Sequence, residues 1–483
     1  MDKTDRLRDY GLAFLLYEQS LGICGYELIR ELFIFIKLIL NSYLVMQNNL
    51  IDKKIVDQKL EACGIRDMED ATIRDIVKVV NMVEAESGEK FIRMEMGVPG
   101  LAPSKIGIDA EIEALRAGCA QFYPMLEGHK EFKEEGSKFV KNFVDINIKP
   151  EGIIPTVGSM QACFAAFMAV TECKKGKDTV LFIDPGFPVQ KTQMQVIGKP
   201  FESFDVYNYR GEKLREKLEE YLSKGNIAAI LYSNPNNPAW ICLTDKELKI
   251  IGELATKYDV IVLEDLAYFA MDFRRDLSVP GKAPFQPSVG KYTDNYIVMI
   301  SGSKLFSYAG QRLGIMCISD ALYNRKYDNL HDRFGGMGTL GYTIVNRIIY
   351  TLSSGTTHSC QYAMAAILKA ANEGRINILD GVREYAERAH AMKELFTKYG
   401  FEIVYDRDLE EPIADGFYFT IIYPGFTGGD LTKEILYYGI SAIPLRDTGS
   451  KKQGLRACVS QTELNRMPEL EERLKRFAAD HTK

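Results

Sequence analysis

The chain has 483 residues, of which 46% are hydrophobic and 26% charged, and its formal net charge is −6 at pH 7. This composition is typical of a folded globular protein and excludes collagen, coiled-coil arrays and long disordered tracts. Because phosphate backbones are bound by basic surfaces, the mildly negative charge also argues against a nucleic-acid partner.

Residues 1–90 are predicted to form a helical N-terminal extension or arm. Apolar residues recur every three to four positions in 51–63 and 71–85, which is the spacing of amphipathic helices. The apolar stretch 32–40 is shorter than the about 20 residues that a membrane helix needs, so no membrane partner is expected. One interpretation of this stretch is a buried or interface helix, and another is that translation begins at Met46. Acidic residues outnumber basic ones in the extension, which disfavours a fused DNA-binding domain.

Between residues 91 and 352 short apolar runs alternate with helical patterns, which predicts a large α/β domain with a mostly parallel sheet. The runs are rich in Val, Ile and Leu and almost uninterrupted, as in strands that are covered on both faces. We expect strands at Thr179–Ile183, Ala228–Tyr232, Val260–Leu263 and Tyr296–Ile300, and helices at Glu212–Lys224 and Asp245–Tyr258.

Residues 353–483 are predicted to form a smaller α+β domain, because helical and strand patterns are segregated there. The fold class is therefore α/β, with an extension, a large domain and a small domain along the chain. In the small domain we expect helices at Gln361–Asn372, Asn377–Tyr399 and Met467–Ala479, and strands at Glu402–Tyr405, Phe417–Ile422 and Leu455–Val459.

Nine cysteines and five histidines are scattered along the chain, with no Cys-x-x-Cys pair and no histidine cluster. Such a pattern predicts neither a disulfide framework nor a metal site. Many unpaired cysteines suit a reducing compartment, so we expect the protein in the cytoplasm.

Polar residues follow three consecutive predicted strands, where they present an amide, a carboxylate with a phenol, and a lysine with an arginine. In open α/β sheets ligands bind beyond the carboxyl ends of the strands, so these groups are expected at one edge of the sheet. A lysine there can form a Schiff base with a carbonyl cofactor. Pyridoxal phosphate needs such a lysine together with an acidic partner for its pyridine nitrogen. The residues are Asn237, Asp265, Tyr268, Lys304 and Arg312.

With these residues the sequence resembles the fold-type I pyridoxal-phosphate-dependent aminotransferases of class I/II, from about residue 91 onward. The family's Asn-Pro-x-Asn-Pro, Asp-x-Ala-Tyr and Ser-x-Ser-Lys-x5-Gly-x-Arg-x-Gly motifs match 234–238, 265–268 and 301–314. The resemblance implies a seven-stranded type of large domain and pyridoxal 5′-phosphate as the cofactor. It implies that Asn237 and Tyr268 bond cofactor O3′, Asp265 pairs with the pyridine nitrogen, Lys304 forms the Schiff base and carries the proton, and Ser301 and Arg312 hold the phosphate.

Matches further upstream extend the implied cofactor site. The turn at 156–161 resembles the family's phosphate-binding helix start, where unpaired N–H groups and the helix dipole favour an anion. Phe187 would stack on the cofactor, and Tyr123 would reach the phosphate of the neighbouring subunit in a homodimer with shared active sites. The backbone contacts to the phosphate would come from Gly158, Ser159 and Met160.

Three residues are matched to the substrate. Arg456 resembles the small-domain arginine that binds the α-carboxylate, and a planar guanidinium suits a bidentate hold on that group. Gly97 matches the N-terminal loop whose backbone approaches the substrate, and Asn237 is expected to contact the substrate as well. The implied activity is transfer of the amino group of an α-amino acid to a 2-oxo acid, with 2-oxoglutarate as the expected acceptor. The alternative is a β-lyase or decarboxylase, because the same cofactor site supports those reactions.

The sequence departs from the family pattern near the expected substrate pocket. Ala239-Trp240 replaces the usual Thr-Gly after the first motif, Leu445 follows Pro444 in place of glycine, and Gln190 stands where many members have tyrosine. No second arginine is matched to a distal carboxylate. The aromatic residues nearby therefore favour a neutral or aromatic amino acid, with glutamate as co-substrate.

Overall fold

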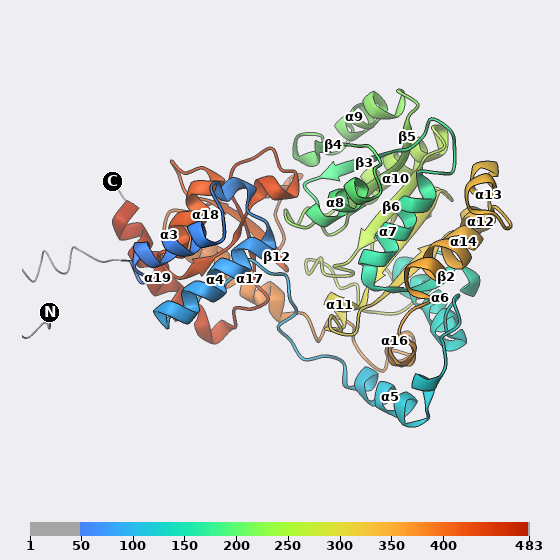
Figure 1. Ribbon diagram of the computed structural model, residues 1–483, viewed down its shortest axis with the longest axis horizontal. Coiled ribbons are helices and arrows are strands. Elements are labelled where there is room, and N and C mark those ends of the chain that lie inside the picture. The colour runs from blue at the N-terminus through green and yellow to red at the C-terminus, as the bar shows by residue number, and fades with distance from the viewer. Residues whose placement is uncertain (1–48, 482–483) are drawn as a thin grey trace, which may run out of the picture.

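The computed structural model describes residues 49–481, which form two lobes of unequal size (Figure 1). The features noted at 32–40 and at Met46 lie outside the described residues. Within the described part, no helix is long and apolar enough to cross a membrane.

The larger lobe is built on a seven-stranded sheet with the strand order β2-β8-β7-β6-β5-β3-β4. Strand β8 runs antiparallel to both of its neighbours, and all other neighbouring pairs are parallel. The predicted α/β class with a mostly parallel sheet is therefore confirmed. The strands are β2 (Ile153–Val157), β3 (Thr179–Asp184), β4 (Phe201–Asp205), β5 (Ile227–Ser233), β6 (Ile261–Leu266), β7 (Tyr296–Ser301) and β8 (Leu313–Ile318).

Helices cover both faces of this sheet (Figure 1), and the continuous apolar runs of the strands follow from that burial. Successive residues of a strand point to opposite faces, so Val298 and Met299 of β7 belong to two separate hydrophobic clusters. The helices are α5 (Lys105–Arg116), α6 (Lys130–Val144), α7 (Gly158–Val170), α8 (Pro188–Val196), α9 (Lys213–Leu222), α10 (Asp245–Lys257), α11 (Gly302–Leu305), α12 (Asp320–Asn324), α13 (Asp328–Phe334), α14 (Leu340–Thr343), α15 (Tyr350–Ser353) and α16 (His358–Asn372).

The smaller lobe is formed by segments from both ends of the described chain. Strand β1 (Ile92–Arg93) pairs in parallel with β13 (Ile440–Ser441), and the turn Met68–Asp70 packs on α18 (Gly428–Leu436). A four-stranded antiparallel sheet with the order β14-β15-β12-β9 completes this lobe. Its other elements are α3 (Lys53–Ala62), α4 (Ile73–Ser87), α17 (Glu384–Lys398), α19 (Met467–His481), β9 (Glu402–Ile403), β10 (Arg407–Asp408), β11 (Glu411–Pro412), β12 (Tyr418–Ile422), β14 (Ile443–Pro444) and β15 (Leu455–Cys458).

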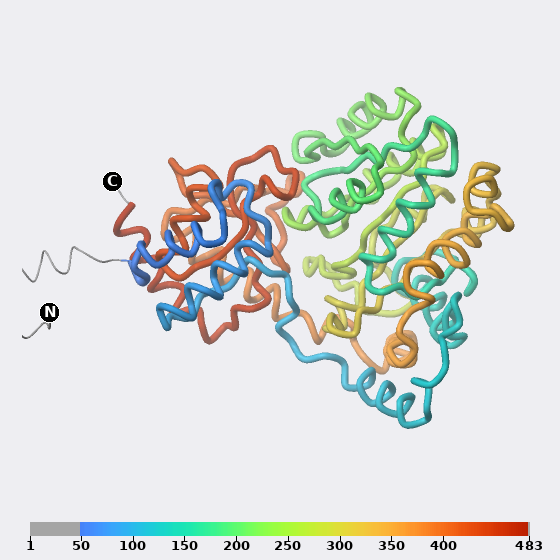
Figure 2. The backbone as a smooth tube through the Cα atoms, viewed as in Figure 1, coloured from blue at the N-terminus to red at the C-terminus, as the bar shows by residue number. Residues whose placement is uncertain are grey.

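The chain passes between the lobes near residue 100 and again after α16, as the backbone trace shows (Figure 2). Helix α16 lies against α5 and α6 of the larger lobe. The helix predicted over 377–399 begins only at Glu384. The Asn377 side chain accepts a hydrogen bond from the Leu379 N–H, which stabilises a turn in place of the helix start.

Candidate active site

A cleft of about 580 Å³ lies where the carboxyl ends of β5, β6 and β7 face the smaller lobe. Its wall contains residues of both lobes and of the loop around Gly97 that leads into the first crossing. Nearly all of the residues predicted for the site line this cleft. They are Gly97, Ser159, Met160, Phe187, Asn237, Asp265, Tyr268, Ser301, Lys304, Arg312 and Arg456.

Asn237 is positioned by a tightly bonded turn after β5. The Asn237 N–H donates to Ser233 Oγ over 3.3 Å, and Asn236 donates from its side chain to the Pro185 carbonyl over 2.7 Å. The Asn234 N–H donates to the Asp265 carbonyl, which fixes the turn against β6. Asn237 is buried, and its Oδ1 has no hydrogen-bond partner among the described residues. Because Asn237 also lines the cleft, its side-chain amide is available to a bound ligand.

Asp265 occupies the end of β6 as a buried carboxylate. Its oxygens accept hydrogen bonds from the Ala267 N–H over 3.0 Å and from Gln190 Nε2 over 2.9 Å. Burial raises the pKa of Asp265 to about 6, although the two hydrogen bonds partly oppose the rise. A protonated ring nitrogen beside this carboxylate would hold it in its charged form. Gln190, noted above as a departure from the family pattern, thus contacts the carboxylate directly.

The phenol of Tyr268 donates to Tyr418 Oη over 2.8 Å, and both rings are buried. Tyr418 belongs to β12 of the smaller lobe and lines the cleft, although no sequence motif pointed to it. Trp240 packs edge to face behind Tyr268, with ring centroids 5.4 Å apart, and does not line the cleft. The expectation that Trp240 contributes to the substrate pocket is therefore wrong, because the indole is fully buried beneath the phenol.

Lys304 lies in the short helix α11, directly after β7, and its ammonium donates to the Gly97 carbonyl. Burial, together with the nearby positive charges of Arg456 and Arg312, lowers the pKa of Lys304 to about 8. A substantial fraction of the amine is thus neutral near physiological pH, which suits a nucleophile and a proton acceptor.

Arg312 and Gly158 form a small polar cradle beside Lys304. Arg312 Nη1 donates to the Ala309 carbonyl over 2.8 Å, and the Gly158 N–H donates to the Arg312 carbonyl over 3.0 Å. Gly158 has a positive φ of 64°, and a Cβ there would lie 2.4 Å from Arg312 Nη2. The positive φ favours glycine at this position, and a Cβ there would displace the guanidinium from the start of α7, where unpaired N–H groups favour an anion. Ser301 Oγ accepts from the Ser303 N–H at the edge of the same cradle.

Arg456 extends from β15 into the cleft as a buried cation. One nitrogen of the guanidinium donates to the Glu95 carbonyl, and the group lies 4.6 Å from the centroid of the Tyr418 ring. Its Nε is buried without a partner among the described residues. A buried guanidinium with a free donor calls for an anion, and a carboxylate matches its planar geometry.

Tyr123 is not brought to the cleft of its own chain. The side chain is 87% exposed, and its neighbours Phe122 and Met125 are 63% and 62% exposed. An exposed apolar loop of this kind indicates a protein interface, so the role predicted for Tyr123 depends on a second subunit.

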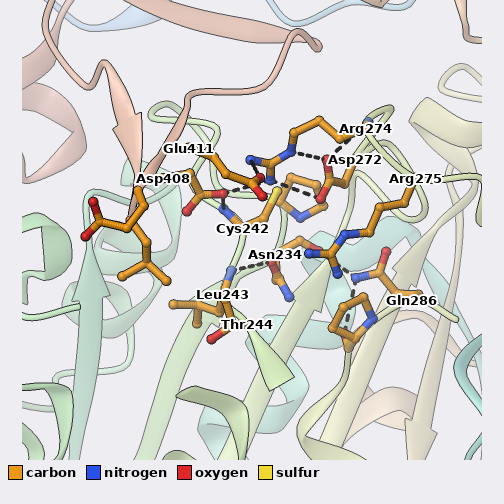
Figure 3. A pocket seen from close by; sticks show the side chains of 14 residues that line it. Asn234, Cys242, Leu243, Thr244, Asp272, Arg274, Arg275, Gln286, Asp408 and Glu411 are labelled. Atoms are coloured by element: carbon orange, nitrogen blue, oxygen red, sulfur yellow. Dashed lines mark hydrogen bonds and ion pairs between the residues drawn. The ribbon is translucent and has the colours of Figure 1, made fainter. Parts of the chain in front are cut away.

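A second, smaller hollow of about 260 Å³ lies against the turn after β5 that contains Asn234 (Figure 3). Asp408 in its wall is paired with two cations, since it accepts from Arg210 over 2.7 Å and from Arg274 over 2.8 Å. Arg274 also bonds Asp272, as the dashed lines in Figure 3 show. The network joins the loop after β6 to β10 of the smaller lobe. It contains no lysine, and we interpret it as a structural link.

The fold and the cleft together define the class of protein. A lysine with a lowered pKa, a buried carboxylate and a glycine–arginine cradle at the ends of parallel strands match the needs of pyridoxal phosphate. The chain belongs to the class I and II aminotransferase family, whose model matches residues 89–474. It is thus a pyridoxal-phosphate-dependent aminotransferase, and its substrates are an amino acid and an oxo acid.

The chain is similar to aminotransferases that are named for different amino acids. The asparagine–oxo-acid transaminase of Streptococcus mutans is 24% identical over 319 residues, which are 66% of this chain and 74% of that protein. Aromatic-amino-acid aminotransferase 2 of Thermococcus litoralis is 30% identical over 241 residues, which are 48% and 58%. The structure of Thermus thermophilus aspartate aminotransferase with maleate superposes with a TM-score of 0.67 at 17% identity, covering 87% of this chain and 98% of that one. These similarities support the fold and the reaction class, and they leave the side-chain specificity open.

The lowered pKa of Lys304 leads to a prediction about cofactor binding. The rate at which pyridoxal phosphate binds to the cofactor-free protein should rise with pH and level off above about 8, because only the neutral amine attacks the aldehyde. If the lysine had an ordinary pKa, the binding rate would keep rising to about pH 10. Stopped-flow absorbance between pH 6.5 and 10 measures this profile, and a continuous rise past pH 9 would contradict it.

Proposed function

We propose that this aminotransferase moves the amino group of an α-amino acid to 2-oxoglutarate in the cleft between the lobes. One observation carries the proposal: an amine, a carboxylate and a guanidinium from three separate segments line the same cleft. They are the side chains of Lys304, Asp265 and Arg456.

In the proposed site the cofactor is held along its whole length. Asp265 pairs with the pyridine nitrogen, and Asn237 and Tyr268 bond O3′. The buried Asp265 carboxylate supports its role, since it accepts only from Ala267 and Gln190 in the chain itself. Asn237 lines the cleft and its side-chain amide has no hydrogen bond among the described residues, so Nδ2 is free to donate to O3′. Phe187 packs on the ring. The phosphate would be bound by Arg312, by Ser301 and by the backbone N–H groups of Ser159 and Met160, in the turn that begins at Gly158. The N–H of Gly158 itself already donates to the Arg312 carbonyl.

Separate residues of the chain are proposed for proton transfer and for substrate binding. When bound, pyridoxal phosphate supplies an electron sink that makes the Cα–H bond of an amino acid acidic. Lys304 Nζ is the proposed proton carrier, because its neutral amine accepts the Cα proton and its ammonium later donates one. Arg456 binds the α-carboxylate, and the Gly97 backbone and Asn237 border the substrate. Tyr418 holds the Tyr268 phenol in place across the lobes.

A panel of twenty amino acids, each with 2-oxoglutarate, tests the proposed function. We expect glutamate to form in equal amount with the new 2-oxo acid, without release of ammonia or carbon dioxide. Ammonia release without an acceptor would indicate a lyase, and carbon dioxide release would indicate a decarboxylase. Either result would overturn the proposal.

We also propose a cytoplasmic location. The eight cysteines among the described residues are free, and most are buried. Unpaired thiols in this number suit a reducing compartment, and cell fractionation would locate the enzyme.

We further propose a homodimer that shares its active sites, with Tyr123 bonding the phosphate in the partner subunit. The exposed apolar loop around Tyr123 supports this arrangement, as do Ile108, Ile112 and Leu115, which are 38–47% exposed on α5. Sedimentation equilibrium should give twice the chain mass of 54.6 kDa.

The phenol of Tyr123 provides a specific prediction. Tyr123→Phe should weaken pyridoxal-phosphate affinity about tenfold, because one hydrogen bond to a charged group is lost while the dimer persists. Tyr292→Phe is the control, since the Tyr292 hydroxyl donates to Asp245 far from the cleft. A fully active monomer, or an unchanged affinity in the Tyr123 variant, would contradict the shared site.

A further inference from the structure

The N-terminal part of the described chain contributes to the wall of the active-site cleft. Helix α4 begins after the N-cap Thr72, and Thr72, Ile73 and Arg74 line the same cleft as Lys304 and Arg456. These three residues precede the segment 89–474 that matches the family model. The wall of the cleft thus includes the guanidinium of Arg74, a residue that no family motif indicated.

The charge of Arg74 is not neutralised by the described residues. Its side chain is exposed, and within 49–481 it has no hydrogen bond and no carboxylate within 4.0 Å. The acidic groups next to it are already engaged. Asp75 accepts from Thr72 in the capping box of α4, and Asp70 lies 3.7 Å from Arg446.

The other arginines of the cleft have assigned contacts. Arg456 bonds the Glu95 carbonyl and faces Tyr418, which orients it toward the α-carboxylate. Arg312 bonds the Ala309 carbonyl in the phosphate cradle. Among the three arginines that line the cleft, Arg74 is thus the one without an assigned contact, and it is available to bind a second anionic group of the substrate.

One carboxylate in the cleft, Asp447, argues for the opposite charge in a ligand. Burial raises the pKa of Asp447, whereas the positive charges of Arg456 and Lys191 lower it. The positive charges offset only part of that rise, so the pKa of Asp447 stays above its usual range. The described wall of the cleft contains four cationic side chains and two carboxylates, Asp265 and Asp447. The balance of the wall favours an anionic substrate side chain over a cationic one.

We infer that Arg74 is a specificity-determining residue that binds the distal carboxylate of a dicarboxylic substrate, the 2-oxoglutarate and glutamate side of the reaction. The inference rests on the proposed function and deepens it. A dicarboxylate would be held at one end by Arg456 and at the other by Arg74, each through a planar guanidinium. The two cations come from β15 and from α4, so the extension helps to select the substrate.

The test compares two acceptors that differ in the distal carboxylate. With one amino donor fixed, kcat/KM is measured for 2-oxoglutarate and for pyruvate in the wild type, in Arg74→Ala and in Arg74→Gln. We expect kcat/KM for 2-oxoglutarate to fall roughly 30-fold or more, because a charged pair is lost. The value for pyruvate should stay within about threefold, since pyruvate has no distal carboxylate to lose. Lys78→Ala is the matched control, an exposed cation one turn along α4 that does not line the cleft.

Equal losses with both acceptors, or an unchanged value for 2-oxoglutarate, would overturn the inference. A binding measurement separates it from the proposed function. Glutarate should raise the melting temperature of the wild-type holoenzyme more than that of Arg74→Ala, whereas butyrate should not distinguish the two. If the wild type transferred no amino group, the proposed function would fail, and the glutarate comparison would still decide the role of Arg74.

Discussion

Replacement of Lys304 by alanine is expected to lower kcat by roughly 10⁴-fold, the largest effect of any single substitution in this chain. The reason is that Lys304 is the single lysine in the wall of the cleft within residues 49–481, so no other amine can take over proton transfer. Its side chain is also the proposed covalent anchor for the cofactor. Steady-state kinetics with the best donor from the amino-acid panel measures the loss.

Two controls make the Lys304 result specific. Lys249→Ala removes a lysine that is 61% exposed on α10, and it should leave kcat unchanged. Borohydride reduction of the wild type followed by peptide mass spectrometry should place the cofactor on the peptide that contains Lys304. A label on another lysine, or a variant that keeps a tenth of the activity with a native circular dichroism spectrum, would refute the assignment.

The larger lobe was predictable from the sequence because its signals are local. The apolar run Val260–Leu263 predicts a strand, and β6 covers Ile261–Leu266, since an uninterrupted apolar run is what a doubly covered strand requires. The carboxyl ends of parallel strands meet at one edge, so Asp265 and Lys304 could be placed together before any coordinates. The number of strands in the sheet is implied only by the resemblance to a family, and the strand order comes from the structure.

The wall on the side of the smaller lobe was less predictable. Strand β1 is only two residues long and pairs with β13 some 350 residues away, a contact that no local periodicity reveals. That pairing ties the segment that contains Arg74 to the smaller lobe, and the sequence gives no sign of it. In the sequence Arg74 has the pattern of an ordinary exposed residue of an amphipathic helix, and only the packing of the lobes brings it into the wall of the cleft.

The second large effect is expected for Asp265→Asn, which should lower kcat by about 10²–10³-fold. The substitution keeps the size of the side chain and removes its negative charge. A neutral amide cannot stabilise a protonated ring nitrogen in a buried site, so the electron-withdrawing power of the bound cofactor would fall. The loss should appear in kcat with every amino acid alike, because the α-carboxylate and the side chain of the substrate are bound elsewhere.

Gln190→Leu provides a graded comparison for this carboxylate. It leaves the charge of Asp265 and removes the hydrogen bond from Gln190 Nε2, so kcat should fall about tenfold at most. Gln190 would thus act as a positioning residue, and a pH titration of the visible absorbance of the bound cofactor should move less in this variant than in Asp265→Asn. If Asp265→Asn stayed within tenfold of the wild type, or fell no further than Gln190→Leu, the charge of Asp265 would not be the source of the catalytic effect. Comparing the loss of kcat in the two variants therefore shows whether the Asp265 carboxylate acts through its negative charge on the cofactor or only through its hydrogen bonds within the fold.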